Sequence, residues 1–136
     1  MKLKSVKAWW DDQFVKIANG RQPYREKSKI VLHDLGFELI DANGNPYPVT
    51  WSNVRGISAF KRDIFSYDLI CFEFHLIDKN LFLEVNEEME GFGLLLKALP
   101  SRFEGFDTEW WSKVVKPAFV TNFTEIWRRK EAVTLA

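Results

Sequence analysis

The apolar residues of this chain change their spacing near Val85, and the change sets the order of its secondary structure. Before Val85 they recur mainly at every second position, which is the pattern of half-buried strands. After it they follow the three- and four-residue spacing of an amphipathic helix, at Met89, Phe92, Leu95, Leu96 and Leu99. In a parallel α/β sheet, strands and helices alternate along the chain. Here the strands come first and the helices last, and this order predicts an antiparallel α+β fold.

Turn residues divide the first part of the chain into short strands. Gly36 separates two alternating segments at 29–34 and 37–41. Asn43-Gly44 is the strongest short-range hairpin signal, and the chain resumes after it as an apolar segment at 47–51. These signals predict three consecutive strands joined by tight turns.

A longer hairpin is predicted further along the chain. Apolar alternation at 69–77 and at 81–86 flanks the polar residues 78–80, which is typical of two antiparallel strands and their turn. A shorter alternation at 14–18 predicts one more strand. The predicted antiparallel sheet therefore has six or seven strands.

The segment between these two groups of strands has a different spacing. Trp51, Val54 and Ile57 recur every three residues, whereas a regular strand requires two. A strand broken by a bulge or a short turn would have this spacing, and Gly56 is a natural place for the break.

Two helices are predicted after Val85 from their capping signals. Asn86 is a favourable N-cap for a helix at 87–99, and Pro100 marks its end. Asp107 in the same way caps a shorter helix at 108–116, which stops before the next proline.

A third helix start is possible at 122–125, where Glu125 occupies the capping-box position. Phe123, Ile126 and Trp127 would form its apolar side. The chain is thus predicted to be a single domain over 1–136, rich in strands at 14–86 and helical at 87–130, with two to three C-terminal helices.

Composition limits the classes of function. The 136 residues include 19 basic and 19 acidic ones, so the chain lacks the broad positive charge of a nucleic-acid-binding protein. It has one cysteine, no secretory signal pattern and no run of 18 apolar residues. We therefore expect a cytoplasmic protein with no nucleic-acid partner and no integral membrane segment.

A cluster of basic and aromatic residues lies between the two predicted strand groups. It contains Phe60, Lys61, Arg62, Phe65 and Tyr67. The simplest interpretation is a hairpin tip, whose polar residues are exposed and form the turn. The functional interpretation is a loop that presents its cations and aromatic rings to an anionic or protein surface.

The residues that could perform chemistry are isolated. The two histidines, His33 and His75, belong to no metal-ligand spacing, so no metal and no cofactor is expected. Glu73 and Cys71 share one face of a predicted strand with His75. We interpret them as structural or exposed side chains, because a nucleophile also needs a paired base and an oxyanion hole.

Aromatic residues are unusually frequent, at 15% of the chain, with six tryptophans. Trp110 and Trp111 are adjacent in a predicted helix and would point about 100° apart. One should face the core and the other should be partly exposed. Together with Trp127 they are candidate anchors for a protein partner, because tryptophan buries a large area at low entropic cost.

The segment Val49, Trp51, Val54 and Ile57 resembles the V-x-W-x-x-I-x-x-I strand of bacterial members of the pleckstrin-homology-like superfold. The resemblance covers residues 28–99. It implies a strongly bent antiparallel sheet, nearly a barrel, which a helix at Met89–Leu99 would plug. The aromatic tail after this helix also resembles that of small uncharacterised bacterial proteins.

The chain departs from the lipid-binding members of that superfold. Their phosphoinositide-binding basic loop is not matched, because the basic residues at 21–29 are diluted by polar ones. Phosphoinositide binding is therefore not implied.

These observations favour a non-enzymatic protein-interaction domain over an enzyme. A more specific alternative is an immunity protein that neutralises a toxin. A second alternative is peripheral binding to an anionic membrane, through the basic residues of the two termini and the 61–67 segment.

Overall fold

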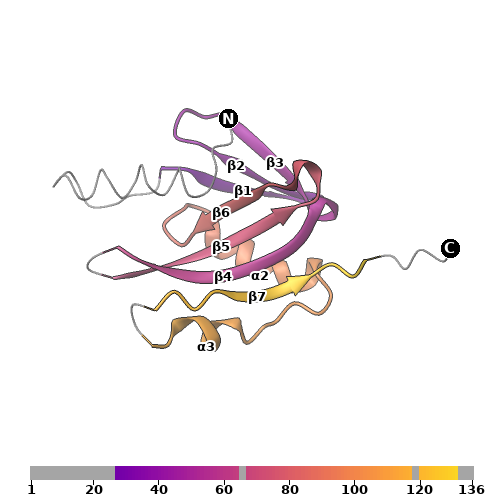
Figure 1. Cartoon of the computed structure of the whole chain (residues 1–136). Helices are drawn as coiled ribbons and strands as arrows, with labels where there is room; N and C mark the ends of the chain where they lie inside the picture. Colours follow the sequence, from indigo (N-terminus) through magenta and orange to yellow (C-terminus); the bar gives the residue numbers. More distant parts are fainter. Residues whose placement is uncertain (1–26, 65–66, 118–119, 132–136) are drawn as a thin grey trace.

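The computed structural model describes residues 27–64, 67–117 and 120–131. Within these ranges the chain forms seven strands and two α-helices (Figure 1). The strands are β1 (Lys29–His33), β2 (Gly36–Ile40), β3 (Pro46–Thr50), β4 (Val54–Asp63), β5 (Asp68–Leu76), β6 (Phe82–Asn86) and β7 (Thr124–Arg128). The helices are α2 (Phe92–Arg102) and α3 (Trp110–Val115). The predicted α+β class is confirmed.

The first three strands form an antiparallel sheet in the order β1-β2-β3. Asp41 shapes the β2–β3 turn, because its carboxylate accepts hydrogen bonds from the backbone N–H groups of Asn43 and Asn45. Gly44 has φ +84, which a glycine adopts without strain. The hairpin that Asn43-Gly44 predicts is therefore confirmed.

The other four strands form a second antiparallel sheet in the order β6-β5-β4-β7. The predicted hairpin between 69–77 and 81–86 is confirmed as β5 and β6, which pair in register from Cys71–Asn86 to His75–Phe82. The break predicted near Gly56 is also present. A short 3-10 turn at Trp51–Asn53 precedes β4, and the pairing of β4 with β5 shifts between Val54 and Gly56.

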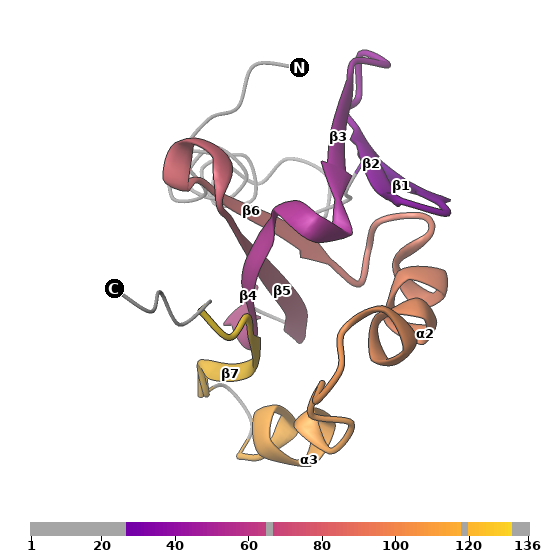
Figure 2. The ribbon, with the colours of Figure 1, turned by 90° about the vertical axis from the view of Figure 1, so that its right-hand side faces the viewer.

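The main core lies between the two sheets and the helices. On the four-stranded sheet, Phe72 and Phe74 point into this core, where they meet Phe37 of β2 and Leu95 and Leu99 of α2. Figure 2 shows α2 and α3 on the same side of the four-stranded sheet. The opposite side of that sheet, which we call the outer face, points away from both helices.

The strands of the described residues do not make one continuous barrel, since they divide into sheets of three and four. The number of strands agrees with the prediction of six or seven, but the prediction that they form one sheet is wrong for the described residues. The resemblance to the pleckstrin-homology-like superfold stays a prediction. The strand predicted at 14–18 lies outside the described residues.

Two helix boundaries differ from the sequence-based prediction. Residues 87–90 are not helical, because Glu90 accepts a hydrogen bond from Ile30 N–H of β1, and Gly91 with φ +89 then starts α2. Asn86 still acts as a cap, but of a turn: its side chain accepts from Glu88 N–H. Pro100 lies inside the last turn of α2 rather than after it.

The third helix predicted from 122–125 is wrong, because the chain there continues into strand β7. Residues of β7 pair with Ala59, Ser58, Ile57 and Gly56 of β4. A long-range strand partner overrides a local capping signal, and β-branched Thr124 and Ile126 suit a strand. None of the described helices has the length and apolar character needed to cross a bilayer.

Candidate functional site

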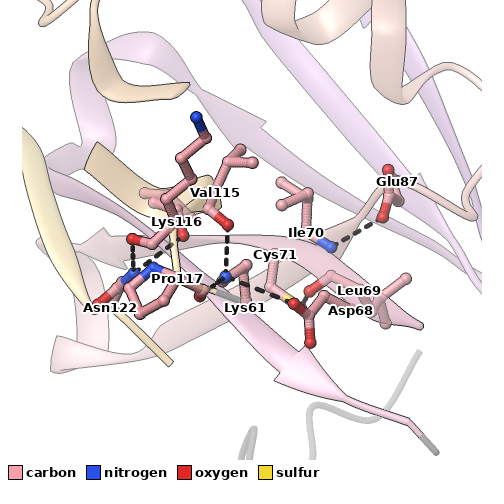
Figure 3. A network of polar contacts seen from close by, with 11 residues as sticks. Lys61, Asp68, Leu69, Ile70, Cys71, Glu87, Val115, Lys116, Pro117 and Asn122 are labelled. Atoms are coloured by element: carbon pink, nitrogen blue, oxygen red, sulfur yellow. Dashed lines mark hydrogen bonds and ion pairs between the residues drawn. The ribbon is translucent and has the colours of Figure 1, made fainter. Parts of the chain in front are cut away.

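Lys61 is the centre of a buried polar network between β4 and α3 (Figure 3). Its side chain is 2% exposed. The Nζ atom donates to the backbone carbonyl oxygens of Val115 at 2.7 Å and Pro117 at 2.5 Å. It also forms an ion pair with Asp68 Oδ2 at 3.4 Å. A buried ammonium group needs such partners, since an unpaired charge in the interior is very costly.

The network holds the C-terminal end of α3 against the sheet. The last carbonyls of a helix have no partner within it. Here Lys61 binds the carbonyl of Val115, while the Asn122 side chain donates to the carbonyls of Val114 at 3.2 Å and Lys116 at 2.6 Å. A positive charge at a helix C-terminus is also favourable to the helix dipole.

The prediction that Lys61 sits on an exposed loop is therefore wrong. It lies within β4, paired with Ile70 of β5, and alternation turns its side chain to the α3 side of the sheet. The hairpin tip comes later, after Asp63, the last residue of β4.

The side chain of Arg62 also contacts other residues of the fold. It lies in β4 on the outer face and binds Glu84 of β6 through two hydrogen bonds, at 2.6 and 3.2 Å. The Glu84 side chain is 2% exposed. The guanidinium also lies 5.0 Å from the centre of the Phe60 ring. These contacts make Arg62 a link between β4 and β6 across the intervening strand.

The aromatic residues of the predicted loop differ in their exposure to solvent. Phe60 is buried and stacks on Phe123, with 5.4 Å between ring centres. Tyr67 is exposed, and its hydroxyl donates to Glu88 Oε1 at 2.6 Å. Burial and this bond to a carboxylate raise the pKa of Tyr67. Phe65 lies outside the described residues.

The three candidate tryptophans have different surroundings. Trp110 is half-buried and meets Phe72 edge-on, with ring centres 4.7 Å apart. Trp127 is half-buried against Phe103, and its indole N–H donates to the carbonyl of Glu104. Trp111 is 53% exposed. The expectation that one residue of the Trp110–Trp111 pair faces the core and the other faces solvent agrees with this placement.

Exposed apolar side chains accompany Trp111 on the elements that follow it. Val120 is 44% exposed and Phe123 is 59% exposed. Val120 shortly precedes Asn122, whose side chain is bonded to the end of α3. Phe123 directly follows Asn122, and its ring turns to the outer face, where it stacks on Phe60. We call Trp111, Val120 and Phe123 the α3–β7 surface. The sequence did not single out the last two as binding residues, because the tail was expected to be helical there.

Cys71, Glu73 and His75 share the outer face of β5 but do not form a reactive set. Burial raises the pKa of the Cys71 thiol well above its usual value, with a further contribution from Glu84. A thiol of this kind is a poor source of the reactive thiolate. His75 stacks on Phe82 at 4.3 Å and contacts Asn80. In the described ranges, no three His, Cys, Asp or Glu side chains are grouped so as to hold a metal ion.

The arrangement around α3 combines a fixed helix end with exposed apolar side chains. The buried cation and the amide of Asn122 fix the helix end, and large apolar side chains face solvent beside it. Comparison of the chain with protein-family models, with curated proteins and with solved structures returned no match.

Proposed function

We propose that this chain is a non-enzymatic protein-interaction domain and that the α3–β7 surface is its binding surface. The exposure of Trp111 carries the proposal. A tryptophan that leaves about half of its side chain in solvent, with Phe123 and Val120 on the adjoining segment, offers a large area for burial by a partner. Such aromatic anchors dominate the energy of many protein interfaces.

The support beneath this surface strengthens the proposal. Lys61 and Asn122 tie the end of α3 to β4 and to the segment before β7. The backbone of that segment is also attached, since Lys61 N–H donates to the carbonyl of Thr121 at 2.8 Å. A surface already held in place loses little conformational entropy on binding, which favours affinity.

The side chains that could take part in catalysis also support the non-enzymatic interpretation. Cys71 is buried with a raised pKa, and Lys61 has its charge balanced inside the fold. His75 is engaged by Phe82 and Asn80 on a different part of the molecule from the α3–β7 surface.

The two alternatives differ in the partner that they require. An immunity protein is a special case of the proposed function, in which the partner is a toxin. Binding to an anionic membrane draws less support, because Lys61 is buried and Arg62 is paired with Glu84. Neither cation of the predicted basic loop is then available to lipid headgroups.

An affinity capture with matched variants tests the proposal. The unaltered chain, a Trp111→Ala/Phe123→Ala variant and a Leu94→Ala variant serve as baits in extract of the source organism. Leu94 is 62% exposed on α2 and controls for the loss of an exposed apolar side chain. We expect a protein that is retained by the unaltered and Leu94→Ala baits and lost with the double variant. A partner held equally by all three would place the binding surface elsewhere.

Identification of the captured protein distinguishes the alternatives. A toxin whose activity falls when the chain is added would establish the immunity function. A pulldown on vesicles with and without anionic lipid tests the membrane alternative, which requires binding that depends on the anionic lipid and on salt.

A further inference from the structure

The outer face of the four-stranded sheet carries a second apolar cluster, separate from the main core. It consists of Phe60, Ile64, Leu69 and Cys71, which are 4%, 4%, 0% and 0% exposed. Both described helices pack on the other side of the sheet, with the main core. Side chains this inaccessible on a sheet face require a layer of chain against them, as in other packed domains.

The described elements account for only a small part of that layer. The ring of Phe123 stacks on Phe60 at one side of the cluster. Leu69 and Cys71 lie one strand further from Phe123, in β5, where Cys71 is paired with Phe60 and Leu69 with Arg62 of β4. The covering segment must therefore reach the middle of the outer face.

We propose that the chain's own N-terminal segment, residues 1–26, docks on the outer face and covers this cluster. The place where the segment joins the described fold supports this. Ile30 N–H of β1 donates to the carbonyl of Glu90 at 2.7 Å, and Lys29 forms a bridge with the same residue. Glu90 follows β6 closely in the sequence. The segment 1–26 therefore joins the described fold near β6, which is an edge strand of the four-stranded sheet.

The length of the segment is sufficient. The distance from β6 to β4 is two strand spacings, or about 10 Å. Even in helical form, 26 residues would span about 39 Å. The other parts of the chain outside the described residues are much shorter: 65–66, 118–119 and 132–136.

The composition of the segment fits the surface. It supplies large apolar side chains for the cluster: Leu3, Val6, Trp9, Trp10, Phe14, Val15 and Ile17. It also carries six basic residues, namely Lys2, Lys4, Lys7, Lys16, Arg21 and Arg25, against three acidic ones, namely Asp11, Asp12 and Glu26. The segment is therefore both apolar and positively charged.

The outer face has the complementary charge. Glu73 of β5 and Glu84 of β6 are opposite each other in the strand register. Arg62 binds Glu84 and also interacts electrostatically with Glu73, so these three side chains supply two carboxylates and one guanidinium. A cationic segment would balance this excess of carboxylates. Docking of the segment on this face would leave Trp111, on the opposite side of the sheet, exposed to a partner.

Cys71 allows a direct test, because it is the one cysteine of the chain and belongs to the cluster. The experiment measures the rate at which an aromatic disulfide reagent labels Cys71 in the native full-length chain. A Trp9→Ser/Trp10→Ser/Phe14→Ser variant removes apolar contacts of the segment. Trp111→Ser, on the opposite side of the sheet, is the matched control.

We expect the triple variant to label about tenfold faster or more, because loss of the covering layer makes local opening easier, whereas the control stays close to the unaltered chain. Equal rates in all three proteins would overturn the proposal. A rate in the unaltered chain that falls as its concentration rises would also overturn it, in favour of a second copy as the cover.

A measurement on the unaltered chain covers the case in which the triple variant does not fold. Nuclear Overhauser contacts are sought between the methyl groups of Leu69 or Ile64 and the aromatic protons of residues 1–26. Their presence is the expected result. If these methyl groups contact only residues after Lys27, the proposal is wrong.

Discussion

The Nζ atom of Lys61 in β4 donates to the carbonyl of Val115 at the end of α3, across 2.7 Å and 54 positions of sequence. The same ammonium group binds the carbonyl of Pro117 and pairs with Asp68 of β5. One side chain thus joins the end of a helix to two strands, and it does so without access to water. The exposed Trp111 lies on the helix that this contact holds.

Replacement of Lys61 by methionine should strongly destabilise the fold. It removes the buried ammonium group that binds two carbonyl oxygens and pairs with Asp68, and the loss of one member of a buried ion pair costs about 3–5 kcal/mol. Chemical denaturation monitored by circular dichroism measures the change. Lys97→Met, on an exposed position of α2, is the control and should change the free energy of unfolding by about 0.5 kcal/mol or less. Similar midpoints for both variants would mean that the network contributes little.

The Arg62–Glu84 pair should show strong coupling between its members. Arg62→Met leaves the buried Glu84 carboxylate without its main cation and should cost about 3 kcal/mol. A second change, Glu84→Leu, then removes the buried carboxylate and should recover part of the loss. A double-mutant cycle on the free energy of unfolding measures this coupling. Additive losses would contradict the inference that the two side chains act as a pair.

The sequence predicts those parts of the fold that are determined by residues close to one another in the chain. The β5–β6 hairpin follows from an alternating pattern and a polar turn within one stretch of chain. The separation of Trp110 from Trp111 follows from helix geometry alone. Each of these features requires information from only a few neighbouring residues.

The features that the sequence misses depend on distant partners. The acceptors of Lys61 are contributed by β5 and by the end of α3, so its burial cannot be inferred from neighbouring charges. The strand β7 exists because it pairs with β4, while the local pattern at 122–125 favours a helix start. Asn122 has φ +48, a conformation that asparagine tolerates better than most residues, but that preference does not identify its role at the end of α3.

The pH dependence of stability should reveal the environment of Glu73. Burial, with added repulsion from Glu84, raises its pKa above the ordinary value of 4.5. The folded state therefore binds this proton more tightly than the unfolded state, and stability falls as pH rises from about 4.5 through the folded-state pKa. Glu73→Gln should raise the melting temperature at neutral pH, and the gain should vanish at a pH below 4.5.

Glu125 provides the opposite case for the same measurement. Its hydrogen bonds from Arg128 lower its pKa, so its contribution to stability is present above 4.5 and is lost as pH falls through the folded-state pKa. Glu125→Gln should therefore slightly lower the melting temperature at neutral pH and converge with the unaltered chain in acid. The same sign of change for both variants would contradict the assigned environments.

The two adjacent tryptophans of α3 should separate stability from binding. Trp110 packs edge-on against Phe72 at 4.7 Å, and its change to alanine removes a large side chain from the margin of the core. We expect a cost of about 3 kcal/mol, at the low end for core aromatics because Trp110 is only half-buried. Trp111 is 53% exposed, and its change to alanine should cost less than about 1 kcal/mol. Denaturant midpoints measure both changes, and the slopes of the two transitions are compared to confirm that the variants unfold in the same way.

Because Trp111→Ala keeps the fold, any loss of a captured partner can be assigned to the surface itself. Equal and large losses of stability would mean that Trp111 belongs to the core, and the binding surface would then have to be sought elsewhere, first around Tyr67.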